Sequence, residues 1–229
     1  MTDKNLTEVI AIVDRSGSMN DIRDDAIGGF NTFLKEQQES KEGKCLLTYV
    51  QFDNEYEVVH EGIDIGDMKA LDYETYAPRG GTALLDAMGQ TINVVGARLE
   101  ATPEEKRPGN VVVVILTDGQ ENSSREFSKD KIKEMVEHQT EKYDWSFVYL
   151  AQNMDAVSSG ASIGIDFSSR KAYVGNVLSG GAGVRAAYCS ASSAVSNMRY
   201  KSVRGQSLDF TDEEKEGMTG ELNSDSSAT

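Results

Sequence analysis

Apolar runs and amphipathic segments alternate along most of this chain. Five runs have the length and composition of strands, namely 9–13, 45–52, 56–60, 111–116 and 145–150. Most of the intervals between them repeat apolar residues every three or four positions, which is typical of helices with one buried face. The helices predicted in this way cover about 21–39, 84–99, 128–141, 154–161 and 182–200. Alternating strands and helices predict an α/β domain with a mostly parallel sheet.

Two segments refine this predicted sheet. Only Asp53-Asn54-Glu55 separates the second run from the third, so these runs predict a hairpin, and the second strand of a hairpin is antiparallel to the first. Segment 171–174 is a marginal candidate for a sixth strand. We therefore expect a three-layer, doubly wound (Rossmann-like) sheet of about six strands with one antiparallel edge strand.

Length and charge limit the functions to consider. The 229 residues suit one domain with a short appendage. A formal net charge of −15 argues against direct binding to nucleic acid or insertion at an anionic membrane, because Lys and Arg carry most of the affinity for phosphates. The sequence shows no basic and apolar leader and no run of about 18 apolar residues. A cytoplasmic protein is expected.

The composition changes near residue 201. Residues 202–229 hold seven acidic residues against two basic ones, with abundant Ser and Gly, which is typical of disorder. The predicted organisation is a folded domain over 1–201 and an acidic, flexible tail over 202–229. Leu208-Asp209-Phe210 is the one part of that tail with the apolar side chains to dock on a surface.

Oxygen-bearing side chains gather where predicted strands end. Asp14-Arg15-Ser16-Gly17-Ser18 follows the first run, Thr82 follows two glycines ahead of a helix, and Asp118 follows the central run. The carboxyl ends of parallel strands meet at one edge of a sheet, where such folds bind ligands. Mg²⁺ prefers six hard oxygen ligands, and Asp14, Ser16, Ser18, Thr82 and Asp118 supply up to five. The sequence therefore predicts a metal site at this edge.

Each of these residues also has an ordinary structural explanation. Ser16, Ser18 and Thr82 could cap helices, and Asp118 could begin an Asp-Gly turn. Any one residue taken singly is better explained in that way. The combination of all five at one sheet edge favours the metal site.

The set Asp14-x-Ser16-x-Ser18, Thr82 and Asp118, in that order and on those elements, resembles the metal-ion-dependent adhesion site of the von Willebrand factor type A family. The likeness spans about 7–200, and the sequences around the five positions resemble the intracellular bacterial and phage branch. It implies that Ser16, Ser18 and Thr82 bind Mg²⁺ directly, with Mn²⁺ or Ca²⁺ as alternatives. It also implies that Asp14 and Asp118 act mainly through bound waters.

The resemblance implies a function in protein binding, in which the metal coordinates an Asp or Glu of another protein. Relatives often act with AAA-type ATPases or assembly subunits, so the expected role is a scaffold or regulatory adaptor. The loops that surround the metal would supply a rim contacting the partner. Candidate rim residues are Arg79, Gln120, Glu121, Asn122 and Asp155.

Two other functions stay open. The chain could be a structural component of a phage or another multi-subunit machine. A Mg²⁺-dependent phosphohydrolase with Asp14 as nucleophile is less favoured, because such enzymes place a second Asp two residues on, where this chain has Ser16. The two histidines, His60 and His138, are not predicted near the Ser-rich loop, which argues against a Ser-His-Asp hydrolase.

Overall fold

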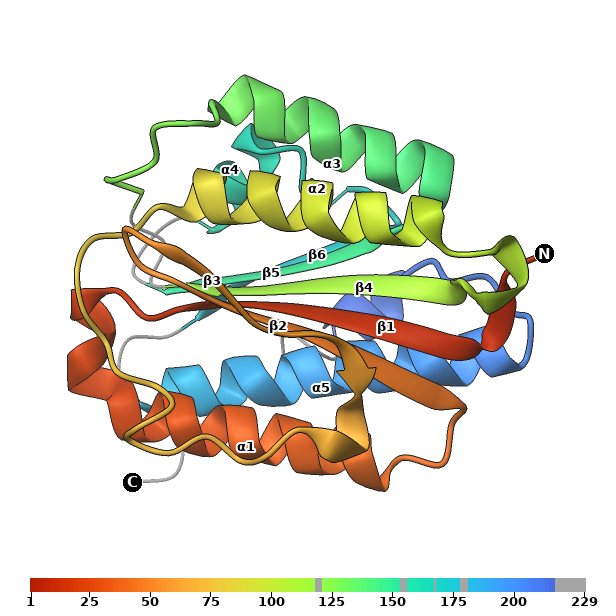
Figure 1. Cartoon of the computed structure of the whole chain (residues 1–229), viewed down its shortest axis with the longest axis horizontal. Coiled ribbons are helices and arrows are strands. Elements are labelled where there is room, and N and C mark those ends of the chain that lie inside the picture. The colour runs from red at the N-terminus through yellow and green to blue at the C-terminus, as the bar shows by residue number, and fades with distance from the viewer. Residues whose placement is uncertain (118–120, 153–155, 167, 178–180, 217–229) are drawn as a thin grey trace.

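The computed structural model describes residues 1–117, 121–152, 156–166, 168–177 and 181–216. Its six strands form one sheet in the order β3-β2-β1-β4-β5-β6 (Figure 1). The strands are β1 (Asp3–Asp14), β2 (Lys44–Phe52), β3 (Tyr56–Asp64), β4 (Pro108–Thr117), β5 (Ser146–Gln152) and β6 (Ala172–Val177). The β2–β3 pair is antiparallel, and the four other pairs are parallel. The predicted sheet, with its antiparallel edge strand, is confirmed.

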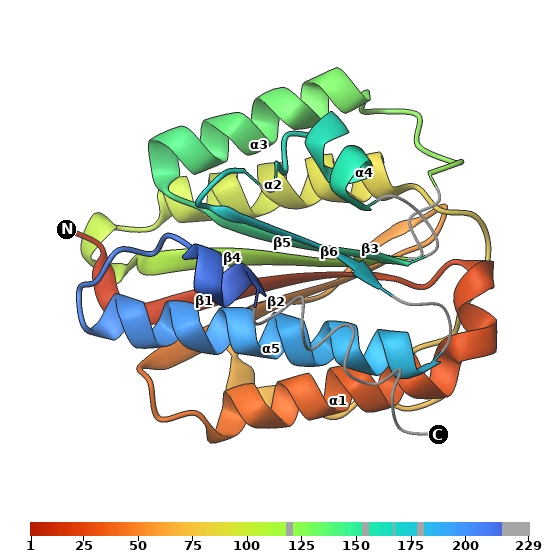
Figure 2. The ribbon, with the colours of Figure 1, turned by 180° about the vertical axis from the view of Figure 1, so that it is seen from behind.

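In the part of the chain that the structure describes, five α-helices cover the two faces of the sheet. They are α1 (Arg23–Glu39), α2 (Leu84–Ala101), α3 (Lys129–Tyr143), α4 (Ala156–Ser162) and α5 (Gly181–Val203). Helices α1 and α5 lie on one face, and α2, α3 and α4 lie on the other (Figures 1 and 2). Three short 3-10 helices also lie in the described part of the chain: η1 (Gly17–Ile22), η2 (Ile65–Asp67) and η3 (Glu104–Lys106). The domain therefore has three layers, as the alternation of strands and helices predicts.

Strand β1 shows why its apolar run is continuous. Val9, Ala11 and Val13 join the core under α1 and α5, whereas Ile10 and Ile12 join the core under α2 and α3. All five side chains are at most 3% exposed. A strand buried on both faces has no position for a solvent-facing polar residue, so its apolar residues run together instead of alternating.

Strands β1 and β3 are longer than predicted, because polar residues extend them beyond their apolar runs. Strand β1 begins at Asp3 and β3 continues to Asp64, although their outer residues are exposed or half-buried. The ladder of backbone hydrogen bonds carries these segments beyond the apolar run that predicts them. The first helical segment begins as η1 at Gly17, within the Ser-rich loop, and α1 follows at Arg23.

The segment after α5 packs on the domain as far as the structure describes it. Leu208 and Phe210 are buried, and the Phe210 amide donates to the Arg170 carbonyl at 2.7 Å. The Lys215 ammonium group is also buried and donates to the Ser169 carbonyl at 2.8 Å. The first part of the expected flexible tail is thus held by specific contacts, and residues 217–229 lie outside the described part of the chain. Within that described part, no helix has the length and hydropathy to cross a bilayer.

Candidate metal centre

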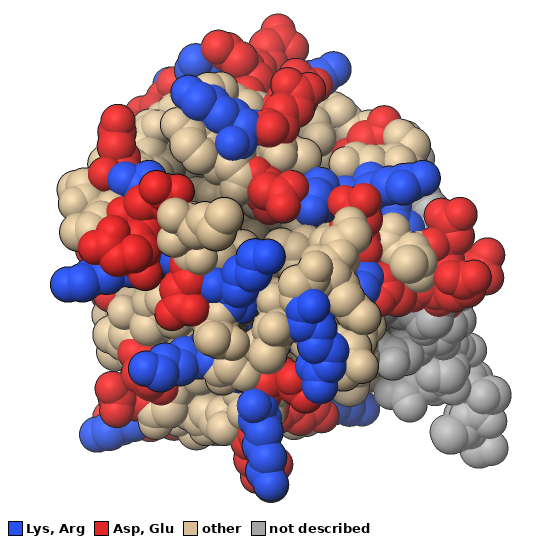
Figure 3. All heavy atoms as spheres, turned by 90° about the vertical axis from the view of Figure 1, so that its right-hand side faces the viewer, with Lys and Arg blue, Asp and Glu red and all other residues tan. Residues whose placement is uncertain are grey.

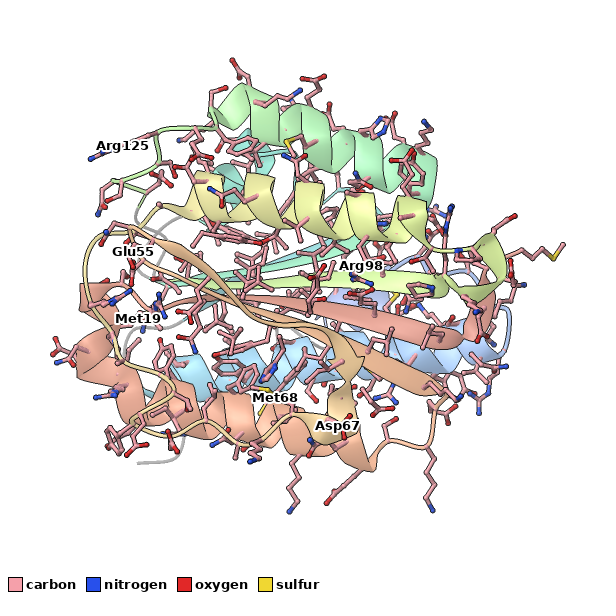
Figure 4. The ribbon with its side chains drawn as sticks, viewed as in Figure 1. Met19, Glu55, Asp67, Met68, Arg98 and Arg125 are labelled. Atoms are coloured by element: carbon pink, nitrogen blue, oxygen red, sulfur yellow. The ribbon has the colours of Figure 1, made fainter. Side chains whose placement is uncertain are left out.

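The candidate centre lies at the carboxyl edge of the sheet, between β1 and β4. These strands are neighbours, but the chain leaves β1 toward α1 on one face and leaves β4 toward α3 on the other. Such a reversal opens a crevice between the two connections, and ligands of α/β sheets bind there. In Figure 4 this edge is on the left, where Met19 and Glu55 are labelled.

Asp14 ends β1 and is fully buried. Its Oδ1 accepts a hydrogen bond from the Ser16 amide at 2.7 Å, and its Oδ2 accepts one from the Thr117 hydroxyl at 2.7 Å. The Tyr76 hydroxyl donates to the Asp14 backbone carbonyl at 2.6 Å. Hydrogen-bond donors on both oxygens hold a buried carboxylate in one orientation. The carboxylate is therefore placed by the ends of both central strands.

Ser16 and Ser18 present their hydroxyls together. The two Oγ atoms lie 3.1 Å apart, with Ser16 buried and Ser18 exposed. Ser16 occupies the N-cap position of η1, but its side chain makes no capping hydrogen bond. The explanation of Ser16 as a helix cap is thus wrong, and its hydroxyl faces Ser18.

Thr82 is clamped by its backbone. Its amide donates to Asn122 Oδ1 at 2.9 Å, and its carbonyl accepts from the amides of Asn122 and Ser123 at 3.0 and 3.2 Å. The N-cap of α2 is Ala83, so Thr82 does not cap that helix. Thr82 is 2% exposed, and its hydroxyl forms no hydrogen bond with any residue in the described part of the chain. A hydroxyl without a protein partner can bind an added ligand.

Backbone hydrogen bonds join the loop of Ser16 to the loop of Thr82. The Gly17 amide donates to the Gly80 carbonyl at 3.1 Å, and the Arg79 amide donates to the Arg15 carbonyl at 2.8 Å. Gly80 has a φ of +66°, and a Cβ there would lie 2.0 Å from Asn54 Oδ1. Glycine is required at this position because only it adopts the conformation without strain or a clash.

Asp53 holds the same two loops through charge. Its Oδ2 accepts from Arg15 Nε at 3.0 Å and from Arg79 Nε at 2.8 Å, and its Oδ1 accepts from the Glu55 amide at 2.6 Å. Burial by itself would raise the pKa of the Asp53 carboxyl. The hydrogen bonds from Arg79 and the Glu55 amide, with the charge of Arg15, hold that pKa below its ordinary value instead.

The predicted rim residues in the described part of the chain hydrogen-bond or ion-pair within the loops of the centre. Glu121 accepts from the amides of Leu85 at 3.0 Å and Ser124 at 2.9 Å, and so supports the first turn of α2. Asn122 positions Thr82, and Arg79 pairs with Asp53 and Glu55. These side chains build the loops of the centre. Three other predicted site residues lie outside the described residues: Asp118, Gln120 and Asp155.

Three residues of this arrangement were not predicted from the sequence. Thr117 and Tyr76 contact Asp14, and Asp53 bridges the two arginines. Thr117 has a local signal, since it is the polar residue that ends the apolar run of β4. Asp53 was interpreted only as a turn residue, and Tyr76 lies in a segment without periodicity. Neither residue therefore had a local signal that pointed to the site.

The donor chemistry of the described residues suits a hard cation. Ser16 and Ser18 supply neutral hydroxyl oxygens next to the fixed Asp14 carboxylate, and Thr82 supplies a third hydroxyl from the loop that is hydrogen-bonded to theirs. Oxygen ligands of this kind are those that Mg²⁺ and Mn²⁺ take. Within the described residues, no three His, Cys, Asp or Glu side chains form a metal cluster.

The architecture is that of the von Willebrand factor type A fold. One similar solved structure is a von Willebrand factor type A protein from Catenulispora acidiphila, with 16% identity and a TM-score of 0.52. Another is the manganese-loaded TRAP protein of Plasmodium vivax, with 15% identity and a TM-score of 0.54. A third is the PilB minor pilin of Streptococcus sanguinis, with 12% identity and a TM-score of 0.56.

These matches establish the fold and no more, because the identities are low. They cover 86%, 80% and 83% of this chain, in the same order, and 42%, 72% and 61% of the other chains. The chain thus spans less than two thirds of the length of two of the three. No family model and no curated protein matches the sequence.

Proposed function

We propose that this chain is a divalent-metal-dependent protein-binding module. The hydroxyls of Ser16, Ser18 and Thr82 would bind the ion directly, and Asp14 and Asp118 would act through bound waters. The observation that carries the proposal is the pair of buried residues, Ser16 and Thr82, whose hydroxyls stand at the ligand-binding edge without capping a helix.

The ligand set decides what the ion would do. Neutral hydroxyls do not cancel the charge of a divalent cation, and carboxylates held behind waters cancel it only in part. The ion then favours an anionic ligand from outside, and in proteins this is the carboxylate of Asp or Glu. Mg²⁺ fits an oxygen-ligand shell in which water and a partner complete the coordination. The manganese-loaded TRAP neighbour supports Mn²⁺ as an alternative, and Ca²⁺ remains a third candidate.

The proposed partner is another protein, such as an AAA-type ATPase or an assembly subunit, for which this chain would be a scaffold or regulatory adaptor. The net charge of −15 supports a protein over a nucleic acid. Figure 3 shows the face at the amino ends of the strands, opposite the centre, and both signs of charge are interspersed over it. Mixed charges of this kind do not favour binding to a phosphate backbone.

We propose binding in preference to catalysis. The chain has two histidines. His60 lies in β3 opposite Tyr49, away from the hairpin turn, and His138 lies on α3 against a groove that Trp145 and Pro108 also line at the other end of the sheet. Neither is placed to act as a base at the Ser16 loop. The phosphohydrolase alternative also lacks a carboxylate at position 16.

Isothermal titration calorimetry with MgCl₂ and MnCl₂ tests the site. Ser18→Ala is the informative variant, because Ser18 is exposed and its loss leaves the buried Asp14 network in place. Affinity for both ions should fall by on the order of 10-fold to 100-fold. Ser168→Ala is the matched control, since this exposed serine precedes β6 at the opposite edge, and it should bind like the wild type. Equal affinities for all three proteins would contradict the site assignment.

The alternative function, a structural part of an assembled machine, predicts self-association. PilB, a minor pilin of the same fold, motivates this alternative. Analytical ultracentrifugation at high protein concentration, with and without Mg²⁺, separates it from a monomeric adaptor. A monomer under both conditions would argue against a self-assembling subunit.

A further inference from the structure

A polar cleft of about 470 Å³ opens beside the candidate metal centre. Its lining comes from the β2–β3 turn, the first turns of α2 and the loop before α3, and includes Tyr56, Ala83, Asp86 and Glu126. Ala83 follows Thr82 in the chain, and the Ser123 amide donates to the Thr82 carbonyl. The cleft and the candidate centre therefore share the clamp on Thr82.

The charges in the lining are mainly negative. Glu55, Asp86 and Glu126 stand against one cation, Arg125. The Asp86 carboxylate accepts hydrogen bonds from the backbone amides of Arg125, Glu126 and Phe127 at 2.7 to 2.9 Å. These bonds fix the carboxylate in place. Glu126 accepts from the Gln90 side-chain amide at 3.0 Å.

Two of these carboxylates lack an ion-pair partner among the described residues. Within the described part of the chain, neither Asp86 nor Glu126 forms an ion pair. Arg125 is exposed and labelled at the outer edge of this loop in Figure 4, and it forms no ion pair there either. Glu55 differs, because it already pairs with Arg79 at 2.6 Å.

The remaining lining is aromatic and apolar. The Tyr56 ring is half-buried, and its hydroxyl lies 3.3 Å from the Thr91 hydroxyl, within hydrogen-bond distance. Ala83 and Ala87 are buried beside it. An aromatic wall and carboxylates suit a side chain with an apolar stem and a cationic head, because the stem packs while the head pairs.

We propose that this cleft receives a lysine or arginine side chain from the same partner segment that supplies a carboxylate to the metal. This inference rests on the proposed function and adds the chemistry of the partner. The metal selects an acidic residue, and the cleft selects a basic residue close to it in the partner sequence. An acidic partner surface without such a basic residue would place uncompensated charge against Asp86 and Glu126.

NMR titration of the ¹⁵N-labelled protein in MgCl₂ tests the inference with synthetic peptides. The probes are capped glycine-rich peptides with one Glu and one Lys, separated by zero to three glycines. Matched peptides carry norleucine, which keeps the stem of Lys without its charge. At the best spacing, the Lys peptide should bind about three- to tenfold tighter than its norleucine partner, as expected of one or two ion pairs that solvent screens. It should also shift the Gln90 side-chain amide signals.

Two variants in the same loop have opposite expectations. Glu126→Gln removes one unpaired carboxylate and should reduce the preference for Lys over norleucine to less than about twofold. Arg125→Gln removes the like charge and should increase that preference. Both side chains are exposed, so neither change threatens the fold.

The results separate the two proposals. Glu peptides that shift residues 16–18 only with Mg²⁺, but with equal affinity for Lys and norleucine versions, would overturn the cleft inference and leave the proposed function intact. The absence of any Mg²⁺-dependent shift at residues 16–18 with every Glu peptide would overturn the proposed function itself.

Discussion

Replacing Asp53 with Asn tests whether buried charge holds the loops of the candidate centre. Asp53 is fully buried and joins Arg15, which is 8% exposed, to Arg79, whose side chain is 56% exposed. Losing a charged hydrogen bond to the buried Arg15 costs about 1.5–3 kcal/mol. The pair with the exposed Arg79 adds only about 0.5 kcal/mol because solvent screens it.

The expected loss in the free energy of unfolding is therefore about 2–3 kcal/mol at neutral pH. For a domain of this size, it corresponds to a fall in Tm of about 5–10 °C. Urea unfolding and thermal melts followed by circular dichroism measure both quantities. Glu57→Gln is the control, because Glu57 also pairs with Arg15, at 2.6 Å, but is 54% exposed. It should cost about 0.5 kcal/mol.

The pH dependence gives a second, independent check on Asp53. The pKa of Asp53 in the folded state lies below its ordinary value of 3.8. The charged carboxylate therefore stabilises the fold fully when the pH is above 3.8, and this stabilisation is lost as the pH falls through the folded-state pKa. Asn does not titrate. The difference between wild type and Asp53→Asn should be constant from about pH 7 to pH 5 and should shrink below about pH 4. A difference under about 1 kcal/mol at pH 7, or one that does not change on acidification, would refute the reasoning.

Two further substitutions test the turn at Gly80 and the segment after α5. Gly80→Ala should lower the free energy of unfolding by about 2–3 kcal/mol. The added Cβ would be strained at the positive φ and would clash with Asn54. These two costs exceed the gain from the smaller loss of chain entropy when Ala folds. Urea unfolding measures this, and a stabilised variant would contradict the assigned conformation. Phe210→Ala should lower the free energy of unfolding by about 3 kcal/mol. Phe210 is 3% exposed, and the centroid of its ring lies 6.5 Å from that of the Tyr173 ring. Wild-type stability, together with unchanged hydrogen exchange at the Phe210 amide, would argue that this segment does not pack as described.

Much of the fold could be predicted because its signals are local. The apolar runs predict the strands, and the three residues between β2 and β3 determine the antiparallel edge, since so short a connection cannot return a parallel strand. Parallel strands then bring the end of β1 and the end of β4 to one edge, so the place of Asp14 follows from the pattern alone.

The roles of individual side chains could not be predicted in this way. Ser16 and Thr82 have capping as a local alternative, and only the observed cap geometry excludes it. Asp53 looks like a turn residue until the fold places Arg15 and Arg79 on its two sides. The burial of Phe210 runs against the polar composition around it, because contacts with Arg170 and Tyr173 come from a distant part of the chain.

The sequence by itself determined the class of fold, the polarity of the sheet and the oxygen-bearing residues at its carboxyl edge. Hydrophobic periodicity and short connections act over a few residues, so they can be read without the fold. Only the tertiary structure decided that the Gly17 and Gly80 loops are bonded together, that Asp53 clamps them and that an acidic cleft opens beside Thr82. Each of these depends on pairs of residues far apart in the chain, and packing alone selects such pairs.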